Sequence, residues 1–146
     1  MTEDNIIDKA LSILKERIRV PGVSISSPDD TISYLTLKLA ECEHEKFCAM
    51  FLDNRHRLIA FKEMFNGTID GASVHPREVV KLALQFNAAA VVFSHNHPSG
   101  DPEPSRADKQ LTRRLTDALA LIDIRVLDHV IIGGIQSVSF AGRGLL

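Results

Sequence analysis

The stretch Ser94-His95-Asn96-His97-Pro98-Ser99-Gly100-Asp101-Pro102-Glu103-Pro104-Ser105-Arg106-Ala107-Asp108 carries the features around which the chain is organised. Two histidines stand two residues apart just past an apolar run, and side chains at i and i+2 of a strand project to the same side. A short loop rich in proline that folds back brings the Asp108 carboxylate beside both imidazoles. Two nitrogens and one oxygen leave a fourth tetrahedral position for water, as in a catalytic zinc site. We therefore predict that His95, His97 and Asp108 bind zinc.

Asp108 also has a purely structural interpretation. Ser105 followed three residues later by an acid, ahead of an amphipathic run, is a capping-box pattern. Both interpretations can hold at once, because the backbone already positions an acid in the first turn of a helix.

These residues carry a resemblance to a known family. The pattern His95-x-His97-Pro98-x-Gly100 followed by Ser105-x-x-Asp108 resembles the metal-binding signature of the JAB/MPN (JAMM) metallohydrolase domain. The flanking segments are similar to the RadC branch of that superfamily: Val74-His75-Pro76-Arg77-Glu78 before it and Leu127-Asp128-His129-Val130-Ile131-Ile132-Gly133 after it. The resemblance extends from about Ser26 to the C-terminus.

The resemblance implies a fold, an activity and further site residues. The fold is α/β, a mixed β-sheet flanked by helices in the three-layer JAB/MPN architecture, which is cytidine-deaminase-like. The activity is zinc-dependent hydrolysis of a peptide or isopeptide bond, with Glu63 as general base and Ser105 as a donor to the oxyanion. Sequence alone also allows Glu78 as the base, although its place in the first turn of a helix suits a cap. The RadC label adds one alternative, a DNA-repair-associated accessory or nucleic-acid-binding protein. A metal-dependent nuclease that uses the same activated water is a further, lesser alternative.

Composition limits the function classes. The chain has 146 residues, of which 45% are hydrophobic and 25% charged, which predicts one domain with a sizeable core. A formal net charge of -2 argues against non-specific coating of DNA. The sequence shows neither an apolar run of the ~18 residues that a membrane span needs nor a signal-peptide pattern, so we expect a cytoplasmic protein. Cys42 and Cys48 form no Cys-x-x-Cys pair, which argues against a zinc nucleobase deaminase.

Hydrophobic periodicity and turn residues predict the elements in order. We expect an N-terminal helix and connector in residues 1–25 and the RadC-like domain in residues 26–146, with the first helix or a hairpin edge available for a homodimer. The expected elements are helices at 5–18, 28–41, 76–87 and 106–121 and strands at 47–52, 58–65, 88–94, 124–132 and 136–140.

The predicted order of elements also places the site. A strand, a helix and a strand in succession predict a right-handed crossover between parallel neighbours, here 58–65 and 88–94. Ligands bind at the carboxyl ends of such strands, so Glu63 is expected to approach the open metal position. Two histidines are left open: His75 as a helix-entry residue or a ligand, and His129 as a group bonded within the sheet or lining the cleft.

Overall fold

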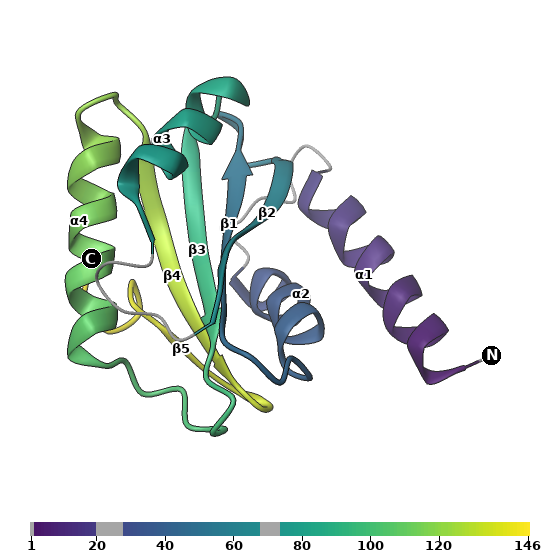
Figure 1. The fold of residues 1–146 in the computed structure, drawn as a ribbon. Coiled ribbons are helices and arrows are strands. Elements are labelled where there is room, and N and C mark those ends of the chain that lie inside the picture. The colour runs from purple at the N-terminus through teal and green to yellow at the C-terminus, as the bar shows by residue number, and fades with distance from the viewer. Residues whose placement is uncertain (1, 20–27, 68–73) are drawn as a thin grey trace.

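The computed structural model describes residues 2–19, 28–67 and 74–146, and Figure 1 shows their arrangement. The elements lie close to the predicted ones. They are α1 (Glu3–Arg19), α2 (Pro28–Leu39), β1 (Lys46–Leu52), β2 (Leu58–Asn66), α3 (Pro76–Gln85), β3 (Ala90–Asn96), α4 (Arg106–Ala120), β4 (Arg125–Gly133) and β5 (Gln136–Ser139).

The five strands form one mixed sheet in the order β2-β1-β3-β4-β5. Among these described strands, the β3–β4 pair is parallel and the other three pairs are antiparallel. Helices α3 and α4 cover one face, and α1 and α2 lie on the other side (Figure 1). The predicted α/β class and the helix–sheet–helix layering are therefore confirmed.

Strand β3 lies at the centre and divides the core into two clusters. Every residue of β3 is buried, as the near-continuous apolar run predicts. Val91 and Phe93 pack toward α3 and α4, whereas Ala90 and Val92 pack toward α2. Because side chains alternate along a strand, the parity of a residue decides which helical layer it meets.

One predicted pairing is wrong. β2 and β3 run in the same direction, but β1 lies between them and pairs antiparallel with both. The physical reason is burial: β1 is apolar on both faces and buried along almost its whole length, whereas β2 has a single buried residue and is otherwise half-buried or exposed. The fully apolar strand therefore takes the inner position and β2 the edge. The parallel pair that does form is β3–β4, joined through α4.

Helix α1 packs on the domain through its apolar stripe. Leu11 and Leu14 contact the α2-side cluster, while Ile6 and Ile13 are exposed. The connector expected between the first helix and residue 26 falls almost wholly outside the described residues, so the division at residue 25 stays a prediction, as does the homodimer. None of the helices among the described residues is both long enough and apolar enough to cross a membrane.

Candidate metal centre

The two histidines lie at the C-terminal end of β3. His95 belongs to the strand and is fully buried, and His97 follows immediately after it with 14% of its side chain exposed. Their Nε2 atoms are 3.0 Å apart, so the prediction that both project to the same side is confirmed. The Phe47 ring of the neighbouring strand stacks on the His95 ring, with centroids 6.0 Å apart.

Asp108 is the third residue of α4 and makes both bonds of a capping box. The Ser105 backbone N–H donates to Asp108 Oδ2 at 2.8 Å, and the Asp108 N–H donates to Ser105 Oγ at 3.0 Å. The same carboxylate places Oδ1 3.2 Å from His95 Nε2 and Oδ2 3.3 Å from His97 Nε2. The predicted capping box is therefore confirmed, and this helix start fixes the Asp108 carboxylate beside both imidazoles, where it could bind a metal ion.

The electrostatics of the three groups favour a positive charge among them. Burial by itself would raise the pKa of Asp108, but its contacts with His95 and His97 outweigh burial and hold that pKa below its usual range. Contact with Asp108 in turn raises the pKa of His97.

The donor set fits a metal ion. His97 Nδ1 lies 2.9 Å from the backbone oxygen of Asp101, and because a carbonyl only accepts, Nδ1 carries the hydrogen and Nε2 presents a lone pair. Atoms of His95, His97 and Asp108 that can each bind a metal all lie within 4.8 Å of one another. Two imidazoles and one carboxylate with a backbone-oriented ring are a typical catalytic zinc arrangement.

Asn96, between the two histidines, points to the opposite face and holds the loop before β1. Its Oδ1 accepts from the Lys46 backbone N–H at 2.7 Å. Its Nδ2 donates to the backbone oxygens of Cys42, at 3.3 Å, and His44, at 3.0 Å. Sequence reasoning missed this role, because nothing local to Asn96 indicates a loop about 50 residues earlier.

Glu45 approaches the site, and sequence reasoning missed it. In the antiparallel β1–β3 ladder Phe47 is opposite His95, so two residues further along Glu45 falls opposite His97 on the same face. The negative charge of Glu45 contributes to the raised pKa of His97, after the larger effect of Asp108. The Glu45 backbone oxygen also accepts from the Gly67 N–H at 2.8 Å, which fixes the loop.

The structure does not bring Glu63 to the three ligands. Glu63 pairs with Cys48 across the β1–β2 ladder, and Cys48 packs in the cluster beneath α2, on the other face from His95. Its side chain is 53% exposed, with Oε1 3.1 Å from Lys46 Nζ. The expected approach of Glu63 assumed β2 beside β3, and the insertion of β1 separates them.

The remaining predicted residues have clear positions. Ser105 is the N-cap of α4 and is exposed beside Asp108. His75 is the exposed N-cap of α3 and makes no side-chain cap bond, so it is a helix-entry residue outside the cluster. His129 is fully buried and contacts His95, with Nε2 2.7 Å from His95 Nδ1. Burial, reinforced by charge on His95, lowers the pKa of His129 well below its usual value.

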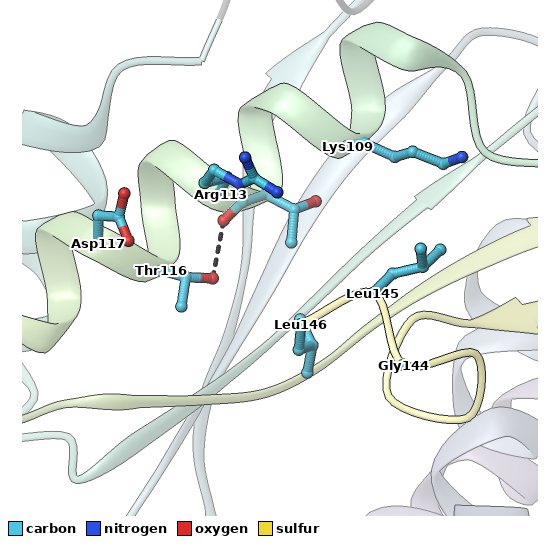
Figure 2. A pocket seen from close by; sticks show the side chains of 8 residues that line it. Lys109, Arg113, Thr116, Asp117, Gly144, Leu145 and Leu146 are labelled. Carbon is cyan, nitrogen blue, oxygen red and sulfur yellow. Dashed lines mark hydrogen bonds between the residues drawn. The ribbon is translucent and has the colours of Figure 1, made fainter.

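A pocket of about 420 Å³ lies between α4 and residues 144–146, and none of the three candidate ligands lines it. Figure 2 shows its wall, where Lys109 and Arg113 supply positive charge and Leu145 and Leu146 supply apolar surface. Thr112 also lines this pocket, and its backbone oxygen accepts from the Thr116 hydroxyl at 2.7 Å.

Comparison with known proteins gives a consistent set of relatives. The family model described as RadC-like JAB domain matches residues 25–145. A UPF0758 protein of Vibrio cholerae is 59% identical over 144 residues, covering 99% of this chain and 90% of the relative. A UPF0758 protein of Thioalkalivibrio sulfidiphilus is 63% identical over 125 residues, covering 86% of this chain but 56% of the relative. The chain thus spans little more than half of some longer relatives, and the shared name states no activity.

Proposed function

The chain belongs to the family of RadC-like JAB domains, and from this premise we propose that it is a zinc-dependent hydrolase with His95, His97 and Asp108 as ligands. The observation that carries the proposal is the convergence of their metal-binding atoms within 4.8 Å. When bound, zinc lowers the pKa of a coordinated water molecule from ~16 to ~7 and polarises a carbonyl oxygen. Three protein ligands leave the coordination position that this chemistry needs.

The general base must accept a proton from the attacking water and return it to the leaving amine. The resemblance implies Glu63 for this role, but in the structure Glu63 is ion-paired with Lys46 on the other face of the sheet. Glu45, opposite His97 by the ladder register, is on the correct face and requires no rearrangement of the sheet. We therefore favour Glu45 and keep Glu63 as the competing candidate.

Ser105 is the candidate donor to the oxyanion. Its hydroxyl is at the exposed N-terminus of α4, where the oxygen accepts from the Asp108 backbone N–H. A hydroxyl and the positive end of a helix both stabilise developing negative charge. Removing one such donor typically lowers the rate by ~10²-fold or more.

The substrate class that this chemistry suits is a peptide or isopeptide bond, because the water-derived nucleophile attacks an amide carbonyl and the base protonates an amine. The two alternatives, a DNA-associated role and a nuclease activity, also start from the membership of this family. The net charge of -2 gives these alternatives no electrostatic support.

The first experiment measures zinc per chain in the native protein and in His97→Ala, Asp108→Ala and His75→Ala. The His75 variant is the matched control, because that histidine is exposed and lies outside the cluster. We expect one zinc per chain in the native protein and the control and none in the other two. The ligand assignment is wrong if the native protein does not bind zinc, or if Asp108→Ala retains a full equivalent of zinc per chain.

The second experiment separates the two candidate bases. Glu45→Gln and Glu63→Gln are compared in zinc content and in cleavage of peptide and isopeptide substrates. Loss of a general base lowers the rate by ~10²–10⁴-fold, and we expect this loss in Glu45→Gln with zinc content unchanged. The opposite pattern would assign the base to Glu63. Cleavage of DNA without cleavage of any amide substrate would favour the nuclease activity.

A further inference from the structure

His95 has a second buried contact, on the side of its ring away from His97 and Asp108. Its Nδ1 is 2.7 Å from Nε2 of His129, a residue of β4 that is fully buried. One of these two nitrogens must carry the hydrogen and the other must accept it. If His95 Nδ1 donates the hydrogen, His95 Nε2 keeps a lone pair that can bind a cation. If His95 Nδ1 accepts, the hydrogen of the neutral His95 ring is on Nε2, and that nitrogen cannot bind a cation.

Thr112 decides between these two arrangements. Its hydroxyl donates to the backbone oxygen of Asp108 at 2.8 Å, and a hydroxyl has only one hydrogen to give. Thr112 Oγ1 also lies 2.5 Å from His129 Nδ1, so in that contact the hydroxyl accepts and His129 Nδ1 donates. A neutral His129 with its hydrogen on Nδ1 has an accepting Nε2.

We propose that Thr112 and His129 form a hydrogen-bonded chain that holds His95 with its hydrogen on Nδ1 and its Nε2 lone pair directed at the ion. The chain runs from the Asp108 carbonyl through Thr112 and His129 to His95, so it begins at one ligand and ends at another. These two residues are positioning residues, since neither reaches the ion itself.

Packing keeps the chain in this geometry. The His129 ring stacks on Phe140, with centroids 4.6 Å apart and planes 20° from parallel. The Phe47 ring meets it edge-on at 5.5 Å. Both rings are fully buried, so a rotation of His129 that exchanged its nitrogens would have to displace core side chains.

The inference rests on the proposed metal site but can be tested without metal. In metal-free protein labelled with ¹⁵N-histidine at pH 8, two-bond proton–nitrogen correlations distinguish the two neutral forms of each ring. We expect His95 and His129 both to carry hydrogen on Nδ1. A His95 ring with its hydrogen on Nε2 overturns the proposal, and does so whether or not the protein binds zinc.

The second arm measures zinc affinity in three variants of α4. Outer-sphere partners of ligands typically contribute 10–100-fold to metal affinity, and we expect that loss in Thr112→Val. Thr112→Ser retains the hydroxyl and should bind zinc like the native protein. Thr116→Val is the matched control, because Thr116 lines the same pocket and bonds a carbonyl one turn back (Figure 2).

The outcomes separate the two hypotheses. If the native protein does not bind zinc, the proposed metal site is wrong. The position of the hydrogen on the His95 ring still tests the hydrogen-bonded chain of Thr112 and His129. Native zinc affinity in Thr112→Val, or an equal loss in Thr116→Val, overturns the positioning role. If Thr112→Val does not fold, rescue by Thr112→Ser and the ring forms of the native protein decide.

Discussion

Asn96→Ala should destabilise the protein more than an alanine substitution of a neighbouring polar residue on β3, because the Asn96 amide holds a whole loop. The side chain makes three backbone hydrogen bonds, two to Cys42 and His44 in the loop before β1 and one to Lys46, the first residue of β1. That loop carries Glu45, the candidate base. The perturbation therefore acts on stability and on the site through one set of contacts.

The expected magnitude follows from the accessibility of the groups left behind. A typical hydrogen bond contributes ~1 kcal/mol net, and a buried group left unpaired costs ~1–3 kcal/mol. His44 is exposed and Cys42 half-buried, so water can replace the amide at their carbonyls, whereas the Lys46 N–H lies against the end of β3. We expect the free energy of unfolding to fall by about 2–3 kcal/mol.

Urea unfolding of the metal-free protein measures this change. Ser94→Ala is the matched control, since Ser94 is buried on the same strand and makes one bond, from Oγ to the Val130 oxygen at 2.9 Å. It should cost ~1 kcal/mol. Asn96→Ala should also keep its zinc but lose activity, because the ligands are held independently of the loop. A loss no larger than that of Ser94→Ala would refute the reasoning.

Three further predictions concern stability and reactivity. Gly133→Ala would place a Cβ 2.7 Å from the Gly100 backbone oxygen, so the loop that follows His97 must move. Urea unfolding should show a loss of ~1–3 kcal/mol, together with weaker zinc binding. A variant as stable as the native protein would contradict this close approach. Burial raises the pKa of Cys48 to about 12, so at pH 8 alkylation followed by mass spectrometry should modify Cys48 only after unfolding, with Cys42 as the internal comparison. Ser105→Ala should cost ~1 kcal/mol as a lost cap and Ser105→Gly only a few tenths; if both lose activity equally, the hydroxyl acts beyond its capping role.

Much of the fold and the candidate ligand set could be predicted because the signals are local. The spacing of His95 and His97 on a strand, and of Ser105 and Asp108 at a helix start, fixes relative positions within a few residues. Asn87 at the end of α3 takes a positive φ of 51°, as its place after a helix indicates. Each of these features depends on backbone geometry that a short segment adopts by itself.

The misses all depend on pairing between distant segments. The sequence does not indicate that β1 separates β2 from β3, so Glu63 could be expected near the ligands. Shifting a strand pairing by one residue moves its side chains to the other face. The strand register therefore places Glu45 on the face of the histidines and Glu63 on the other face, and no local sequence pattern distinguishes the two glutamates.

The sequence by itself determined the elements, the apolar character of the central strand and the residues able to bind a metal. Only the tertiary structure decided which glutamate lies near the histidines, which amide holds the loop, and how Thr112 and His129 orient His95. The physical reason is that hydrogen bonds among buried side chains are directional and form between residues far apart in the chain, as the sequence separation of 34 between His95 and His129 illustrates. Such contacts exist only once the sheet register and the seating of α4 on the sheet are fixed.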